Sequence, residues 1–208
     1  MLTRPRRALG DSQAEFAMPF LSKPSRDVVR DFIAAQARLD YTYPALGATA
    51  SEPPPGYVVD RTRVELGAGE DTFRAARAAL ARWDHFGLGW VEAAPADTPI
   101  EVGAVVAVAA RVMGVWWLNA CRIVYVVDDD GPVRRSGFAY GTLPGHAESG
   151  EERFLIEWDR ASDGVWYDVL AFSRPRHPLA RLGYPLTRRT QRRFARDSAR
   201  AMQAAVRR

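Results

Sequence analysis

The sequence has few of the residues that build disulfides and metal sites. Of its 208 residues, one is cysteine, Cys121, and three are histidine. A single cysteine excludes a disulfide within the chain, which fits a reducing compartment. No stretch offers about 18 consecutive apolar residues, and the N-terminus lacks the apolar run of a secretion signal. We therefore expect a cytoplasmic protein with no membrane span, no metal and no cofactor.

Lysine is almost absent as well. Lys23 is the only lysine, so arginine supplies nearly all of the positive charge, and the net charge is +4. A charge of this size spread over a whole domain is a weak signal for nucleic acid. We expect nucleic acid not to be a partner.

The arginines gather near the C-terminus, which leaves two interpretations open. The arginine-rich segment could be a solvated helix face, or it could bind nucleic acid or an anionic surface. Asp197 lies among these arginines and favours the first interpretation. Salt-dependent retention of DNA or RNA would support the second.

The composition is that of a folded domain. Hydrophobic residues make up 47% of the chain and charged residues 26%, which is ordinary for a globular protein. The length suits one domain. Residues 1–20 are polar and contain Pro5 and Gly10, so we predict a disordered tail there and a single domain over residues 21–208.

Hydrophobic periodicity predicts helices over residues 25–39, 70–83 and 185–206. Ser25 is suited to cap the first of them, and Pro185 is suited to the first turn of the last. Residues 57–67 alternate between apolar and charged side chains, as in a half-buried strand. A short strand over residues 86–92 and further strands between residues 102 and 173 complete the series.

Short turns join most of these strands, which indicates an antiparallel meander. Such a sheet needs a cover on its inner face, and the C-terminal helix is the candidate. The run from Gly137 to Gly141 places only glycine and alanine on one face of its strand. That face lets another group approach the backbone closely, or leaves room for a ligand.

Several unusual strings occur in order along the chain. They are TYPALGAT from Thr42, WWLNACRIVYVVD from Trp116, FAYGTLPGHAESGEERF from Phe138 and AFSRPRHPLARLGYP from Ala171. Together they resemble domain-of-unknown-function family nineteen-ninety over about residues 42–206. That family is similar to the START-related (SRPBCC), pollen-allergen-like helix-grip superfamily.

This resemblance implies an α+β fold in which a curved antiparallel sheet of about seven strands wraps around a long C-terminal helix. It also implies a cavity between the sheet and the helix. The superfamily includes lipid and hormone carriers, aromatase/cyclases and other enzymes, so the fold alone does not assign an activity.

The polar loop near residue 146 contains the candidate catalytic residues His146, Glu148 and Glu152. Histidine titrates near neutral pH, and a neighbouring carboxylate could orient it. The alternative is a polar hairpin loop whose acids pair with arginines. Glu152 shares a strand face with Phe154, Ile156 and Trp158, so an inward face would bury it, with Arg122 as its natural partner.

Aromatic and polar residues on the predicted strands are candidates for a ligand site, although each of them alone fits a plain core equally well. The candidate ligand-binding residues are Trp117, Arg122, Tyr125, Phe138, Tyr140, His146, Asp168 and Arg174. The function we favour is binding of a hydrophobic or aromatic small molecule, with possible action on it. The alternatives are an enzyme of the cyclase or hydrolase type that uses the His146 loop, and a structural protein without a ligand.

Overall fold

The computed structural model describes residues 18–176 and 183–207. In this part of the chain, eight strands form one antiparallel sheet, in the order β2-β8-β7-β6-β5-β4-β3 with β1 beside β5. The strands are β1 (Met18–Phe20), β2 (Val58–Ala68), β3 (Val91–Ala94), β4 (Val105–Val112), β5 (Val115–Asp130), β6 (Val133–Thr142), β7 (Glu148–Asp159) and β8 (Gly164–Pro175). The α-helices are α1 (Arg26–Gln36), α2 (Gly69–Ala81) and α4 (Tyr184–Ala205), and the short 3₁₀ turns are η2 (Ala48–Ala50) and η3 (Asp84–Phe86).

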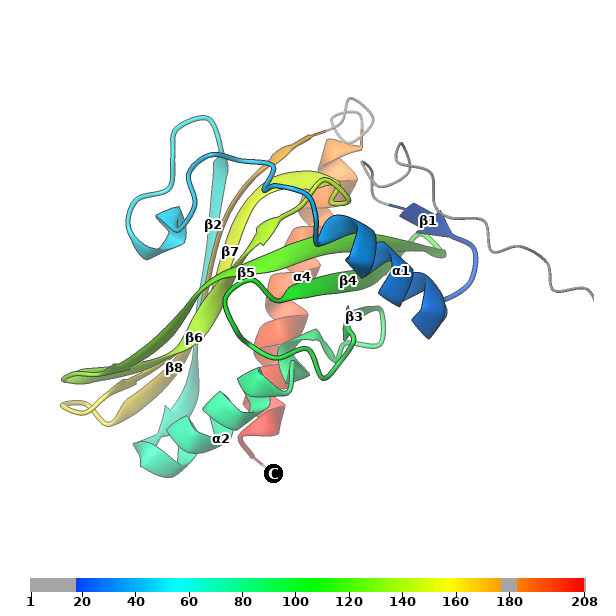
Figure 1. Cartoon of the computed structure of the whole chain (residues 1–208). Coiled ribbons are helices and arrows are strands. Elements are labelled where there is room, and N and C mark those ends of the chain that lie inside the picture. The colour runs from blue at the N-terminus through cyan, green and yellow to red at the C-terminus, as the bar shows by residue number, and fades with distance from the viewer. Residues whose placement is uncertain (1–17, 177–182, 208) are drawn as a thin grey trace, which may run out of the picture.

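The sheet curves around the C-terminal helix, as Figure 1 shows with the orange-to-red α4 behind the green strands β4 and β5. Consecutive strands from β3 to β8 are neighbours in the sheet, and β2 then pairs with β8 across a long stretch of sequence. This is the α+β helix-grip fold that the sequence predicts. The predicted meander is confirmed.

The sheet has one strand more than the seven predicted, because residues 18–20 pair with β5. Met18 lies opposite Leu118 and Phe20 lies opposite Trp116. These three residues fall within the disordered tail predicted for residues 1–20, and they form a strand instead. Residues 1–17 lie outside the described residues.

Helix α1 forms where the sequence predicts a helix. The Ser25 hydroxyl accepts a hydrogen bond from the Val28 N–H, and this cap satisfies one of the free donors at the helix start. Val29 and Phe32 are buried on the convex face of the sheet, where they pack near Leu118. This face of the sheet is therefore covered by α1.

The main core lies on the concave face. Phe73 and Leu80 of α2, Phe86 of η3 and Met202 of α4 pack there against inward side chains of the sheet. The predicted helices over residues 70–83 and 185–206 are confirmed to within two residues at each end. Since α4 packs mainly through Ser198, Ala199 and Met202, its C-terminal half is the anchored half.

The strand predicted over residues 86–92 is wrong. Residues 84–86 form a 3₁₀ turn, and the strand begins at Val91. Gly89 has a φ of 74°, which interrupts an extended backbone. The turn places Phe86 in the core, where its ring lies 4.9 Å from that of Phe194.

Candidate functional site

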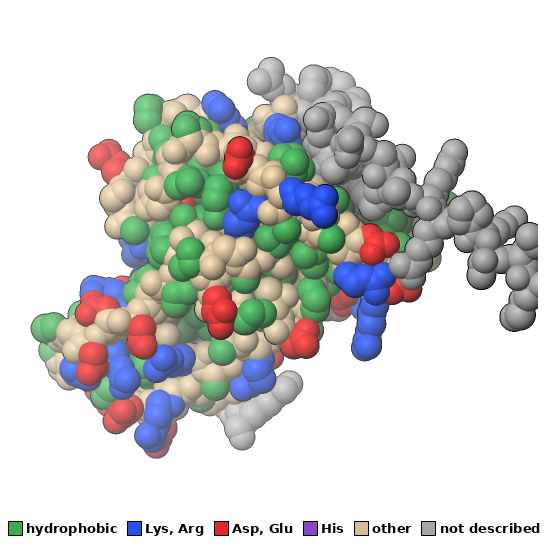
Figure 2. Space-filling view, viewed as in Figure 1, with side chains coloured by type: hydrophobic (Ala, Val, Ile, Leu, Met, Phe, Trp, Pro, Cys, Tyr) green, Lys and Arg blue, Asp and Glu red, His purple; other side chains and the backbone are tan. Residues whose placement is uncertain are grey.

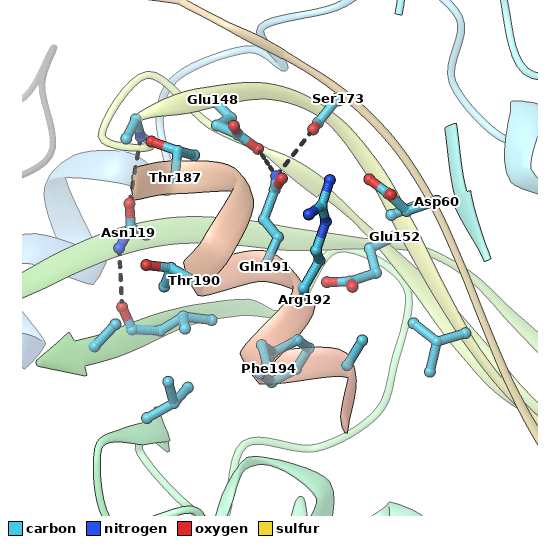
Figure 3. A pocket seen from close by; sticks show the side chains of 18 of the residues that line it. Asp60, Asn119, Glu148, Glu152, Ser173, Thr187, Thr190, Gln191, Arg192 and Phe194 are labelled. Carbon is cyan, nitrogen blue, oxygen red and sulfur yellow. Dashed lines mark hydrogen bonds between the residues drawn. The ribbon is translucent and has the colours of Figure 1, made fainter. Parts of the chain in front are cut away.

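A cavity of about 1280 Å³ lies between the concave face of the sheet and α4. Figure 3 shows its side chains converging from α4 and the facing strands. Apolar lining residues include Val64, Phe86, Val108, Val169, Ala171 and Phe194. Polar lining residues include Asp60, His146, Glu148, Glu152, Gln191 and Arg192.

The cavity exists because short side chains face it where the sheet curves away from the helix. Thr187, Thr190, Ala195 and Ala199 line it from α4, and Ala110 lines it from β4. These short side chains leave space between α4 and the sheet, which larger side chains such as Phe194 border.

Polar contacts hold the N-terminal half of α4 over this space. Arg188 forms an ion pair with Asp60 of β2, with Nη2 2.6 Å from Oδ1. Gln191 donates through Nε2 to Glu148 and to the Ser173 hydroxyl, the latter at 3.2 Å. Helix α4 is therefore fixed to β2, β7 and β8 by side chains that reach across one end of the cavity.

Glu152 lies on the wall of the cavity, opposite Tyr140 of the neighbouring strand β6. The Tyr140 hydroxyl donates to Glu152 Oε2 at 2.7 Å. Burial is the main cause that raises the pKa of Glu152 to about 7, and the charges of Glu148 and Asp60 raise it further. Glu152 thus shares the inward face with Phe154 and Ile156, which the sequence had left as a condition.

Arg122 is not the partner of Glu152, which corrects the predicted buried pair. Its side chain lies on the opposite face of the sheet, where Nη2 donates to the carbonyl oxygens of Ala37 and Leu39, each at 2.9 Å. The guanidinium also lies over the ring of Tyr41, at 5.3 Å. Arg122 thus binds carbonyl groups at the C-terminal end of α1 and does not pair with Glu152.

His146 lines the cavity, but it differs electrostatically from the expected neutral-pH titrating group. Its Nδ1 accepts a hydrogen bond from the Glu148 N–H at 3.0 Å. Burial lowers the pKa of His146 to about 4, so the ring is neutral at pH 7. A neutral ring that accepts at Nδ1 carries its proton on Nε2 and can donate there.

The acids of the same loop divide between the two faces of the sheet. Glu148 is buried beside α4, and burial raises its pKa. Glu151 instead turns its carboxylate to the convex side, where the Tyr43 hydroxyl and the Gly47 N–H donate to Oε2 at 2.7 Å each. Thr49 donates to it as well. Glu151 therefore anchors the 43–49 loop.

The glycine- and alanine-only face of β6 is where this loop packs. A Cβ added at Gly141 would lie 2.1 Å from the Tyr43 hydroxyl oxygen, so only glycine fits there. Of the two alternatives that the sequence left open for this face, close approach of another group is the one observed.

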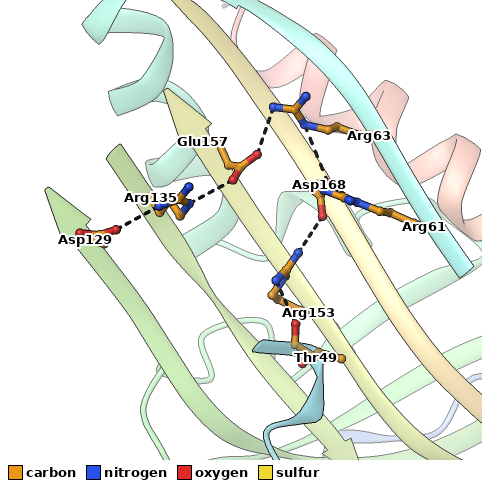
Figure 4. A network of polar contacts seen from close by, with 8 residues as sticks. All are labelled: Thr49, Arg61, Arg63, Asp129, Arg135, Arg153, Glu157 and Asp168. Carbon is orange, nitrogen blue, oxygen red and sulfur yellow. Dashed lines mark hydrogen bonds and ion pairs between the residues drawn. The ribbon is translucent and has the colours of Figure 1, made fainter. Parts of the chain in front are cut away.

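A charge network covers the convex face of the sheet, as Figure 4 shows. Asp168 is fully buried and accepts from Arg61 Nη2 at 2.7 Å and from Arg153 Nη2 at 3.0 Å. Arg63 and Arg135 meet at Glu157, each at 3.1 Å. The buried Asp168 thus has the partners that its burial requires.

His85 is a buried polar residue that sequence reasoning missed. Its ring stacks on Trp83 at 5.6 Å and lies 4.7 Å from that of Phe154. Neither ring nitrogen has a hydrogen-bond partner within residues 18–176 and 183–207, and burial lowers the pKa of His85 to about 3. The sequence around it, WDHFG, resembles an exposed turn and gives no signal of this burial.

Comparison with known proteins assigns the chain to a family. A family model described as a domain of unknown function, DUF1990, matches residues 42–201. The chain belongs to the DUF1990 family. A UPF0548 protein of Dictyostelium discoideum is 39% identical over 203 residues, with 88% of this chain and 94% of that protein covered. A UPF0548 protein of Deinococcus radiodurans is 37% identical over 197 residues, with 89% and 97% covered.

Among solved structures, that of Ara h 8.0201 is similar to this DUF1990 chain, with a TM-score of 0.45 and 13% identity. The similarity covers 73% of this chain and 98% of that one, and it concerns the fold alone. The resemblance to the DUF1990 family stated from the motifs is thus confirmed by the family model and by the two relatives.

The structure of this DUF1990 protein brings part of the predicted site together. Trp117, Tyr140 and His146 line the cavity with Glu148 and Glu152. The other five candidates are placed elsewhere. Phe138 lies in the core behind the cavity, Arg122, Tyr125 and Asp168 have their partners on the convex face, and Arg174 lies over the ring of Tyr57 at 4.6 Å.

Two residues that line the cavity, Asp60 and Gln191, had no sequence signal, and neither had Arg188, which pairs with Asp60. Each appears in a polar or charged run that looks solvated, and only the docking of α4 on the sheet brings them to Glu148 and to one another. Contacts over such separations cannot be inferred from local periodicity.

Charges of both signs are mixed on the face of the DUF1990 domain that Figure 2 shows. At the hairpin tips, Asp130 pairs with Arg160 at 2.6 Å, and Asp129 pairs with Arg135 at 3.2 Å.

In the described part of the chain, no helix has the length and apolarity that crossing a membrane requires. Within the same residues, no group of three or more His, Cys, Asp or Glu side chains is arranged to hold a metal ion.

Proposed function

We propose that this protein binds a hydrophobic or aromatic small molecule in the cavity between the sheet and α4. The observation that supports the proposal most directly is the cavity of about 1280 Å³ itself, which is at least as large as typical ligand sites. A structural protein with a filled core needs no such space.

The lining has the composition of a ligand site. Aromatic rings of Phe86, Trp117 and Phe194 offer apolar surface, and a few polar groups stand among them. Ligand sites combine these features, since apolar contact provides affinity and a small number of polar groups fixes orientation. Tyr140 and Glu152 are such groups here, because their hydrogen bond lies on the cavity wall.

A double variant and a matched single variant test this proposal. Val108→Trp combined with Ala171→Trp places two indole rings in the cavity, because both residues line it. Val126→Trp is the matched control, since Val126 is exposed and is not part of the lining. Binding of a hydrophobic fluorescent probe, 1-anilinonaphthalene-8-sulfonate, should weaken at least about tenfold in the double variant and stay unchanged in the control. Equal binding by all three proteins would contradict the proposal.

Acid–base catalysis on the bound molecule is a second candidate function, and Glu152 favours it. A carboxyl with a pKa of about 7 exchanges a proton readily at neutral pH, as a general acid or base must. His146, neutral and able to donate through Nε2, lines the same cavity. We place Glu152 first because its pKa matches neutral pH.

Mass spectrometry of small molecules released from the protein separates the two candidates. If Glu152 acts on its ligand, the Glu152→Gln variant purified from the native host accumulates a molecule different in mass from the one held by the wild type. His146→Ala and Glu148→Ala provide the comparison for the neighbouring loop. An identical molecule in all four proteins would leave binding without catalysis.

A further inference from the structure

The carboxyl of Glu152 lies on the cavity wall, and one of its oxygens has no hydrogen-bond partner among the described residues. Oε2 accepts the Tyr140 hydroxyl at 2.7 Å. Oε1 has no hydrogen-bond partner among the described residues, and in Figure 3 the carboxyl projects into the pocket. A bound molecule can therefore reach this oxygen.

Within residues 18–176 and 183–207, no cation forms an ion pair with Glu152. Arg153, the next residue, turns to the convex face and pairs with Asp168 at 3.0 Å. Arg188 pairs with Asp60. Within the described ranges no ion pair includes Glu152, and the exposed Arg192 that lines the same cavity forms none with it. A carboxylate in such a place is short of one positive charge.

Aromatic rings line the same cavity as this carboxyl. Phe86, Tyr140 and Phe194 line the cavity, with ring centroids of Phe86 4.9 Å from Phe194 and 6.3 Å from Tyr140. Ring faces attract cations. Trp90 of the same lining already holds a cation, the Arg193 guanidinium at 4.1 Å from its ring centroid.

We propose that the ligand of this cavity carries a protonated nitrogen, which binds between Glu152 Oε1 and the neighbouring aromatic rings. The inference rests on the proposed function, because it names the chemical class of the molecule held there. An aromatic or aliphatic amine supplies both the apolar body that the cavity accepts and the charge that Glu152 lacks.

The groups that face Glu152 come from every element around it. They are Glu148 on its own strand, Asp60 on β2, Cys121 on β5, Tyr140 on β6, Tyr167 on β8 and Arg192 on α4. An amine stays protonated up to about pH 10. The amine therefore binds more tightly as rising pH ionises Glu152.

Three probes with one ring system test the inference, namely 2-(1-naphthyl)ethylamine, 2-(1-naphthyl)ethanol and 3-(1-naphthyl)propanoic acid. Calorimetric titrations at pH 5 and pH 8 compare their affinities. At pH 8 the amine should bind about tenfold more tightly than the alcohol, and at pH 5 the preference should fall to about threefold or less. At pH 7 Glu152 is half ionised, so binding of the amine should release roughly half a proton from its carboxyl.

The variant Glu152→Gln keeps a hydrogen-bond acceptor for Tyr140 and removes the charge. It should bind the alcohol as the wild type does and lose the preference for the amine. Equal binding of amine and alcohol at pH 8 would overturn the inference while the proposed function stands. Tightest binding of the acid, lost in Arg192→Gln, would overturn it in favour of an anionic ligand. Binding of none of the three probes would overturn both.

Discussion

Glu152 makes the ligand-free protein less stable at alkaline pH than it would be with a neutral side chain. Its pKa rises from 4.5 to about 7 on folding, so the folded state holds a proton that the unfolded state has lost between these pH values. The stability that this bound proton contributes to the folded state is fully present below pH 4.5 and is lost as pH rises through 7. The difference of 2.5 between those two pKa values amounts to about 3 kcal/mol at pH 8.

Glu152→Gln should remove this loss. The amide keeps an oxygen for the Tyr140 hydroxyl and carries no charge to desolvate. At pH 8 the variant should be more stable than the wild type by about 3 kcal/mol, or roughly 10 °C in Tm for a chain of this length. At pH 4.5 the two proteins should unfold at the same urea concentration.

Urea unfolding at pH 4.5, 6 and 8, followed by tryptophan fluorescence, measures the difference. Glu157→Gln is the control, because Glu157 lies on the same strand but pairs with Arg63 and Arg135 on the convex face. The Glu157→Gln control should not be more stable than the wild type at pH 8. A Glu152→Gln variant that is no more stable at pH 8, or gains as much at pH 4.5, would refute the assignment of an uncompensated carboxyl to the cavity wall.

Three further substitutions test other parts of the fold. His85→Phe should stabilise the protein by about 2 kcal/mol at pH 5 and by less at pH 7. The pKa of His85 is lowered on folding, so the stability of the wild type decreases as the pH drops from 6.5. A gain in stability that does not depend on pH would contradict this. Asp168→Asn should destabilise by about 3 kcal/mol, since it leaves Arg153 without its acid, whereas loss of the half-exposed Arg61 side chain in Arg61→Ala should cost about 1 kcal/mol or less. Equal losses of unfolding free energy in Asp168→Asn and Arg61→Ala, measured by denaturant unfolding, would count against a buried network. Gly141→Ala should cost about 1–3 kcal/mol through its clash with Tyr43, and the loss should shrink in a Tyr43→Ala background.

The fold was predictable because each element shows its own periodicity. Alternation in β2, the spacing of Phe73 and Leu80 in α2 and the breaker Pro185 at the start of α4 each indicate an element without knowledge of the others. Strand β1 was not predictable, since three residues are too few to show a period. Its pairing with β5 depends on a contact that local pattern does not encode.

The face of each strand was predictable only as far as the strands are regular. Glu152 is inward because Phe154 and Ile156 are, and β7 has no irregularity between them. In β5 a bulge between Ile123 and Tyr125 reverses the alternation, so Tyr125 turns to the convex side and its hydroxyl lies 2.7 Å from that of Thr49. Tyr125 was a candidate as one of the aromatic residues of the strands, and the sequence does not show the bulge that turns it away from the cavity.

The measurement that tests the cavity most directly is native mass spectrometry of the protein purified from its own host. The wild-type spectrum should contain a species heavier than the chain by the mass of one small molecule, absent from the Val108→Trp/Ala171→Trp variant and present in Val126→Trp. Wild-type protein that carries no added mass and also fails to bind 1-anilinonaphthalene-8-sulfonate would contradict it.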